Sequence, residues 1–174
     1  MTDIVFETER LLVREIERDD FEQLNRICSD PELMKFVGDS NPLPPEQTLK
    51  WIEVTICNYM EQGFGNYAVI EKTGSAFIGY CGLVYSESIN QIELIYALKK
   101  EYWNKGLATE VAIAMLDFGH SRKKIETIYA SIDPLNVASK KVLEKIGFKY
   151  AFLKNDEFGL PSVYYSSYNP KNKM

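Results

Sequence analysis

Alternating apolar and polar residues mark several short stretches of the chain as β-strands. Apolar side chains at every second position place one face of a strand against a core, and β-branched and aromatic residues favour such stretches. The segment "KTGS" at residues 72–75 separates two of these stretches and is typical of a hairpin turn. The pattern predicts strands at residues 10–15, 67–71, 77–85, 91–98, 127–132, 150–153 and 163–168.

Apolar residues spaced three and four positions apart indicate helices between these strands. Asp19 and Asp20 offer side-chain oxygens that can cap the first helix, and Pro31 interrupts its pattern. The predicted helices follow Asp20, span 45–62, run from about Lys105 to His120, and span 136–146. The expected buried faces carry Phe21, Leu24 and Ile27 in the first helix and Leu49, Ile52, Ile56 and Tyr59 in the second.

The order of these elements predicts an α/β fold with a mixed sheet. The chain of 174 residues has no linker and no internal repeat, so we expect one domain spanning residues 1–174. Its 45% hydrophobic and 26% charged residues are typical of a globular protein. The net charge of −5 argues against a nucleic-acid partner or an anionic membrane surface, and no apolar run approaches the length of a membrane span.

The cysteines and the histidine limit the chemistry that the chain can perform. Cys28, Cys57 and Cys81 are odd in number and lie in apolar surroundings, which indicates reduced thiols in a protein core. They form no CxxC or Cys/His cluster, so no metal site is predicted. His120 is the sole histidine, which disfavours a Ser-His-Asp or Cys-His hydrolase. With an acidic N-terminus that lacks a hydrophobic signal core, these features favour a cytoplasmic protein.

The third predicted helix begins in a way that suits an anion. It follows Asn104-Lys105-Gly106, and no Ser-x-x-Glu capping box precedes it. A helix start has unpaired backbone amides and a partial positive charge, so it binds phosphate. Gly106 would let a ligand approach the backbone closely, and Lys105 would add a charge. In the alternative interpretation, Asn104 caps the helix and water satisfies the other amides.

The residues around this start resemble the acetyl-CoA loop of the GNAT N-acetyltransferases. That motif reads Gln/Arg-x-x-Gly-x-Gly/Ala, and Trp103, Gly106 and Ala108 fill its three places in "YALKKEYWNKGLATEV". Trp103 departs from the general motif but is similar to the "YWGKGYAT" form of the RimJ/RimL-like branch, which acetylates protein N-termini and other amines. The segments "ETERLLVREIERDDFEQL", "YAVIEKTGSAFIGYCGL" and "NVASKKVLEKIGFKY" also resemble that branch, so the likeness covers nearly the whole chain.

The resemblance implies a GNAT fold, with a mostly antiparallel sheet of about seven strands and about four helices. The sheet would splay between the strands that end near Leu98 and Ile132, and the thioester of acetyl-CoA, the cosubstrate, would lie in that gap. The backbone of Tyr96, Ala97 and Leu98 would pair with the pantetheine arm, and Asn136 would hydrogen-bond the cofactor. The pyrophosphate loop would consist of Trp103, Asn104, Lys105, Gly106, Leu107, Ala108 and Thr109.

Glu93 is the first catalytic candidate, because acetyl transfer to an amine needs a base for the ammonium proton. It interrupts the apolar run "IELIYAL", where burial would raise the pKa of its carboxylate towards the range of a base. It also matches the Glu of the "EIGYWL" strand in RimJ/RimL-like enzymes, which implies a base that acts through water. The alternative is a solvated carboxylate near a strand start.

Ser139 is the second catalytic candidate. On a helical wheel it falls among Ala138, Val142, Leu143 and Ile146, so we expect its hydroxyl to point towards the sheet. The resemblance implies that it could protonate the leaving thiolate, whereas a helical serine commonly bonds a carbonyl one turn earlier. Other GNAT enzymes use a tyrosine for this step, and the alternative donors here are Tyr129, Tyr164 and Tyr165.

These residues predict a cytoplasmic N-acetyltransferase that moves an acetyl group from acetyl-CoA to a primary amine by direct attack in a ternary complex. A protein N-terminal amine is the leading acceptor, and a polyamine, amino acid or antibiotic is the alternative. A non-catalytic module that binds acetyl-CoA or a protein partner is the rival of another class. We expect the two N-terminal helices, the loop at 41–45 and the last hairpin to build the acceptor pocket, in a monomer or a homodimer.

Overall fold

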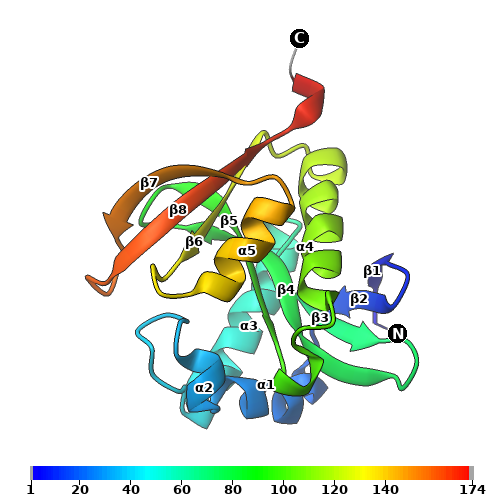
Figure 1. Ribbon diagram of the computed structural model, residues 1–174. Coiled ribbons are helices and arrows are strands. Elements are labelled where there is room, and N and C mark those ends of the chain that lie inside the picture. The colour runs from blue at the N-terminus through cyan, green and yellow to red at the C-terminus, as the bar shows by residue number, and fades with distance from the viewer. Residues whose placement is uncertain (1, 173–174) are drawn as a thin grey trace.

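The chain forms one eight-stranded sheet with helices on both faces, described for residues 2–172 in a computed structural model (Figure 1). The α-helices are α1 (Phe21–Cys28), α2 (Pro31–Met34), α3 (Pro45–Glu61), α4 (Leu107–Asp117) and α5 (Val137–Lys145). The strands are β1 (Ile4–Glu7), β2 (Leu11–Glu15), β3 (Asn66–Glu71), β4 (Ala76–Ser86), β5 (Gln91–Leu98), β6 (Thr127–Ile132), β7 (Lys149–Asn155) and β8 (Pro161–Tyr168).

The sheet is antiparallel except at its centre. Its strand order is β1-β2-β3-β4-β5-β6-β8-β7, and β5 and β6 are the parallel pair. These two strands are in register at one position, Glu93 opposite Tyr129. Beyond it they separate, so Tyr96, Ala97 and Leu98 pair with β4 on one side and with no strand on the other. The predicted splay between these strands is therefore present.

Sequence periodicity predicts seven of the eight strands to within two residues of their ends. It misses β1, whose four residues have no apolar alternation and expose both end positions. It also misses the short helix α2, because Pro31 reads as an interruption. The Asp30 side chain accepts hydrogen bonds from the amides of Glu32 and Leu33 and so caps a new helix. Pro31 is the first residue of that helix, where a backbone amide would have no partner within the helix, so proline is tolerated there.

The helices form two layers around the sheet. In Figure 1, α4 and α5 cover one face, and α1 and α3 lie behind the other. Under α4 and α5 the larger core holds Val111, Met115 and Leu143 from those helices. The smaller core holds Leu24 and Ile27 from α1 and Ile52 from α3. Burial of each such side chain contributes about 1.5–3 kcal/mol, so both faces of the sheet are anchored.

Helix α3 buries most of the predicted face, since Ile56 and Tyr59 pack against the two cores, but Leu49 does not belong to it. Ile52 is buried as expected, but Leu49 is 48% exposed, and Thr48 and Thr55 are buried instead. Cys57 lies on the exposed side of α3, so the prediction of a core thiol is wrong at that position. The physical reason is that α3 packs against α1 and β4 along the line through Thr48, Ile52 and Thr55. The other two cysteines are buried and unbonded, as predicted.

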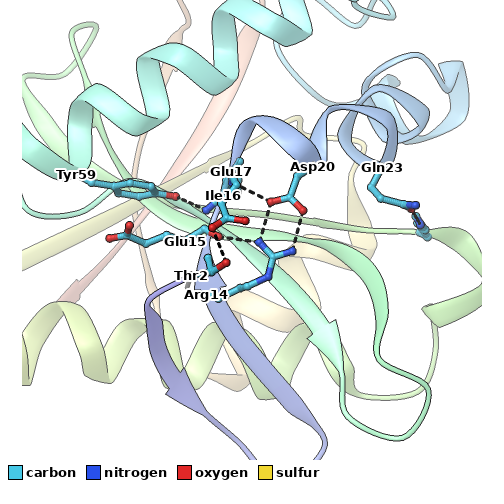
Figure 2. A network of polar contacts seen from close by, with 9 residues as sticks. Thr2, Arg14, Glu15, Ile16, Glu17, Asp20, Gln23 and Tyr59 are labelled. Carbon is cyan, nitrogen blue, oxygen red and sulfur yellow. Dashed lines mark hydrogen bonds and ion pairs between the residues drawn. The ribbon is translucent and has the colours of Figure 1, made fainter.

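The carboxylate of Asp20 does not cap α1, which corrects the prediction from Asp19 and Asp20. Instead it forms a two-pronged ion pair with the guanidinium of Arg14 at 2.7 Å and accepts the Glu17 amide at 2.9 Å (Figure 2). Nearby, the Tyr59 hydroxyl from α3 accepts the Ile16 amide at 3.0 Å and donates to the Asn66 carbonyl. These contacts join β2, α1, α3 and β3.

Tyr59→Phe is expected to lower the free energy of unfolding by about 1–3 kcal/mol. The phenyl ring keeps its stacking on Tyr67, at 5.2 Å between centroids, but the buried Ile16 amide loses its acceptor. Urea denaturation measures the change. Tyr85→Phe is the matched control, because it removes a hydroxyl from a ring that is 46% exposed. Equal losses in both variants would contradict the role assigned to the Tyr59 hydroxyl.

Candidate active site

Glu93 lies at the point where β5 and β6 part. Alternation along β5 places Glu93 and Ile95 on the face that carries α1 and α3, and Leu94 and Tyr96 on the face that carries α4 and α5. Beyond Glu93 the two strands separate, so the free edge of β5 lies between the groups on its two faces.

The carboxylate of Glu93 is buried without a full set of partners. The side chain is 8% exposed, and Oε1 has no hydrogen-bond partner among the described residues. Burial raises the pKa of Glu93, and the nearby hydroxyls of Ser131 and Ser86 oppose the rise. An unpaired buried carboxylate is costly, and a raised pKa suits a base that must work near neutral pH.

A cavity of about 480 Å³ opens beside Glu93. It is lined by the segment after α2, the β4–β5 turn, the end of β6 and the turn of the β7–β8 hairpin. The last hairpin lines it, as expected for the acceptor pocket. Phe36, Gly38 and Ser40 line it in place of the predicted loop at 41–45, because that loop leads directly into α3 and lies outside the cavity wall.

The start of α4 has the geometry of an anion site. Gly106 is the N-cap residue, with φ +76° in the left-handed region, and no side chain of residues 2–172 caps the helix. Asn104 therefore does not cap it, and this alternative interpretation is wrong. The first-turn amides, from Leu107 to Thr109, are left without a side-chain acceptor. A side chain at Gly106 would be strained by its φ and would meet the Arg10 guanidinium, 3.6 Å away.

Arg10 and Glu110 brace this loop from outside it. The Arg10 side chain donates to Oε2 of Glu110 at 2.7 Å and to the Lys105 carbonyl at 2.9 Å. Thr8 donates its hydroxyl to Oε1 of Glu110 at 2.6 Å. The network ties the loop to the entrance of β2. Sequence reasoning missed it because the partners lie about a hundred positions apart and form no motif.

Some of the other predicted loop residues contact the rest of the protein, and others are exposed. The Trp103 indole donates to the Leu98 carbonyl at 2.7 Å, which ties the loop to the end of β5 and engages one of the predicted pantetheine-binding carbonyls. The Lys105 ammonium lies over the ring of Tyr102, 5.2 Å from its centroid. Leu107 buries its side chain in the core and so contributes its backbone alone to the loop surface.

Ser139 and Tyr96 meet on the face opposite Glu93. Ser139 is half-buried on α5, so its side chain faces the sheet as predicted. Burial raises the pKa of Tyr96 to about 12, and the Ser139 hydroxyl beside it opposes the rise. The Tyr96 hydroxyl has no hydrogen-bond partner of good geometry among the described residues. Sequence reasoning assigned only the backbone of Tyr96 to the site and missed its side chain.

Asn136 and the alternative tyrosines occupy separate positions. Asn136 caps α5 through its side-chain oxygen, which accepts the Ser139 amide at 3.1 Å. Tyr164 lines the cavity, and its hydroxyl lies 3.3 Å from that of Ser88. Tyr129 packs against Phe152, and Tyr165 is buried in the larger core. Of the three alternative tyrosines, Tyr164 alone lines this cavity.

The sequence profile of the acetyltransferase (GNAT) domain matches residues 10–149, from Arg10 of the brace to the start of β7. This match covers more than half of the chain. The chain belongs to the GNAT acetyltransferase family. It is therefore an acetyl-CoA-dependent N-acetyltransferase, and the resemblance seen in its motifs is confirmed.

Several known proteins resemble this chain over most of its length. It is 32% identical over 147 residues to the uncharacterised protein YkkB of Bacillus subtilis, covering 83% of this chain and 84% of that one. A GNAT acetyltransferase structure from Bacillus anthracis is 25% identical, with a TM-score of 0.80 over 97% of this chain and 99% of that one. The ribosomal L7/L12 α-N-protein acetyltransferase RimL in complex with coenzyme A shares the fold at 15% identity, with a TM-score of 0.81 over 95% and 98% of the two chains.

The residues of this GNAT enzyme fit acetyl-CoA at the two places that the geometry provides. The uncapped amides at the start of α4 suit a pyrophosphate, and the unpaired edge of β5 suits an extended arm with amide groups. Within residues 2–172, no group of three metal-binding side chains comes together, and no helix has the length and apolarity of a membrane span.

Proposed function

We propose that the enzyme acetylates a primary amine that enters the cavity beside Glu93, with Glu93 as the base. The observation that carries this proposal is the unpartnered, buried carboxylate of Glu93 at the wall of the cavity and at the gap between β5 and β6. A carboxylate kept there without a counter-charge is destabilising, which favours a functional reason for it.

The proposed chemistry needs few protein groups. Bound acetyl-CoA supplies an activated acetyl thioester, from which the acetyl carbon passes to the amine nitrogen as its bond to sulfur breaks. Glu93 accepts the ammonium proton through a water molecule, which leaves a neutral nitrogen with a free electron pair. The amides at the start of α4 and the β5 edge hold the cosubstrate in place, so attack occurs within a ternary complex.

Ser139 is the proposed proton donor for the sulfur that leaves. It lies on the opposite face of β5 from Glu93, which would suit an acid and a base that act from opposite sides of the transferred group. Tyr96, beside it, can orient the Ser139 hydroxyl or replace its proton. We propose no part for Tyr129 and Tyr165, since packing accounts for their positions.

Ser139→Ala is expected to lower kcat by about ten- to a hundredfold, with the affinity for acetyl-CoA unchanged. The loss is at the low end for an acid catalyst because a thiolate leaves readily without a proton. Steady-state kinetics and calorimetry measure the two quantities. Tyr96→Phe is the companion variant, and a loss in it without a loss in Ser139→Ala would make tyrosine the donor.

Release of free coenzyme A thiol on mixing the chain with acetyl-CoA and an amine tests the proposed function. A panel should contain monoamines, polyamines, amino acids, aminoglycosides and peptides with free N-termini. We expect thiol release that depends on both the amine and the enzyme, with a stable acetamide as the product by mass spectrometry. Binding of acetyl-CoA with no turnover on any amine of the panel would contradict the proposal.

A further inference from the structure

The cavity beside Glu93 carries charge of one sign. None of its lining residues, all within the described part of the chain, is a lysine, arginine or histidine. The ammonium of Lys154, which is not a lining residue, donates to the backbone carbonyl of Ser88 at the cavity wall. Five lining side chains are carboxylates: Glu87, Glu93, Asp133, Asp156 and Glu157.

None of these carboxylates is neutralised by an ion pair within residues 2–172. Asp133 and Asp156 each accept backbone amides of their own turns, such as that of Leu135 at 2.7 Å. Glu87 and Glu157 are exposed and have no hydrogen-bond partner there. Unlike the two aspartates, Glu87 and Glu157 do not stabilise a turn, so their negative charge is available to bind a ligand.

The carboxylates lie close enough to affect one another. The charge of Glu157 adds to the rise in the pKa of Glu93 that burial causes. Burial also raises the pKa of Tyr164, and the charges of Glu93, Asp156 and Glu157 add to it. Mutual repulsion among like charges is relieved when a cation enters between them.

Glu93 supplies an independent indication of a ligand. Glu93 lines the cavity and is more than nine-tenths buried, and its Oε1 has no hydrogen-bond partner among the described residues. Aromatic residues also line the cavity, namely Phe36, Tyr85 and Phe158. Aromatic faces attract ammonium groups and cover methylene chains. The volume of about 480 Å³ falls in the range of small-molecule sites.

We propose that the acceptor is a small linear diamine or polyamine, with its reacting nitrogen at Glu93 and a second ammonium between Glu87 and Glu157. This inference rests on the proposed function. A single N-terminal ammonium would pair with one carboxylate and leave the others without a counter-charge. A molecule with two or three ammonium groups on a methylene chain matches both the spread of charge and the aromatic wall.

Steady-state kinetics on four acceptors test the proposal: a linear triamine, a diamine, a monoamine with the same carbon chain, and a short peptide with a free N-terminal alanine. We expect kcat/KM for the triamine to exceed that for the monoamine by about tenfold or more at low salt, and the ratio to fall as salt screens the charges. Equal values for the triamine and the monoamine would overturn the inference, and so would a preference for the peptide.

A double variant separates the second ammonium site from the chemistry. Glu87→Gln with Glu157→Gln should lower the ratio of triamine to monoamine kcat/KM by about tenfold. Glu61→Gln with Glu126→Gln is the control, because it removes the same charge from residues that do not line the cavity. An equal fall in the control would overturn the inference. No turnover on any of the four acceptors would overturn the proposed function itself, whereas turnover without a preference for the triamine overturns the inference alone.

Discussion

Glu93→Gln is expected to lower kcat by about a hundred- to ten-thousandfold and to leave the affinity for acetyl-CoA unchanged. Glutamine has nearly the same shape and can still contact Ser86 or Ser131, but it cannot accept the ammonium proton at neutral pH. The cosubstrate contacts proposed for α4 and the β5 edge do not include the Glu93 side chain. Thiol release measures turnover, and calorimetry measures acetyl-CoA binding.

The pH dependence of the same variant identifies the group. A base works in its ionised form, so native kcat/KM should fall as pH drops through the pKa of Glu93. Because burial raises that pKa, the fall should begin above the value of about 4.3 that is ordinary for glutamate. The Glu93→Gln profile should lack this acid limb. A variant that kept the limb and most of its turnover would show that another group is the base.

Thermal unfolding distinguishes loss of the base from loss of the fold. A carboxylate whose folded pKa lies above its unfolded pKa binds a proton more tightly in the native state. Native stability is then greatest below the unfolded pKa and declines as pH rises towards the folded pKa. At neutral pH the Glu93→Gln variant should therefore be at least as stable as the native chain. A lower melting temperature would attribute the lost turnover to misfolding.

Gly106→Glu is expected to weaken acetyl-CoA binding by about a hundredfold or more. The added carboxylate would compete with phosphate for the amides at the start of α4, and each charge-assisted hydrogen bond lost is worth about 1.5–3 kcal/mol. The new side chain would also lie beside Arg10 and draw its guanidinium from Glu110. Calorimetry on the native chain and the variant measures the difference.

Gly63→Glu is the matched control for this substitution. Gly63 has φ +75°, against +76° for Gly106, so both variants carry the same backbone strain. Each glycine also lies near one cation: Lys123 Nζ at 3.5 Å from a side chain at Gly63, and Arg10 Nη2 at 3.6 Å at Gly106. The control should bind acetyl-CoA normally. Equal losses in both would assign the effect to strain, and no binding by the native chain would refute the cofactor loop.

Local patterns predicted most of the fold because local forces determine those elements. Alternation and turn residues fix the strands of the sheet, and helical periodicity fixes α3, α4 and α5. The errors arose where a contact with another element of the fold decides. Asp20 has the position of a cap, but Arg14 on β2 takes its carboxylate. Cys57 has apolar neighbours, but the packing of α3 turns it outward.

In the candidate site too, residues with a local signal in the sequence were predicted, and groups that only the fold brings together were not. Glu93 was predicted because a charge inside an apolar strand is visible in the sequence, and Gly106 because it precedes a helix that lacks a capping box. The brace formed by Arg10 and Glu110, and the acidic wall of the cavity, could not be predicted. Their members come from segments with no common motif, and only the turns of the folded sheet bring them together.

The single register pair between β5 and β6 has a consequence for how the protein avoids aggregation. A strand edge with free amides and carbonyls recruits other strands, so most folds shorten, charge or cover their edges. The parting of these two strands creates an additional pair of edges inside the molecule. Five strands lie on one side of them and three on the other, so a foreign sheet is excluded while a single narrow chain is admitted. The free amides and carbonyls of β5 thus stay available for hydrogen bonds, without the risk of aggregation that a free strand edge brings at the surface.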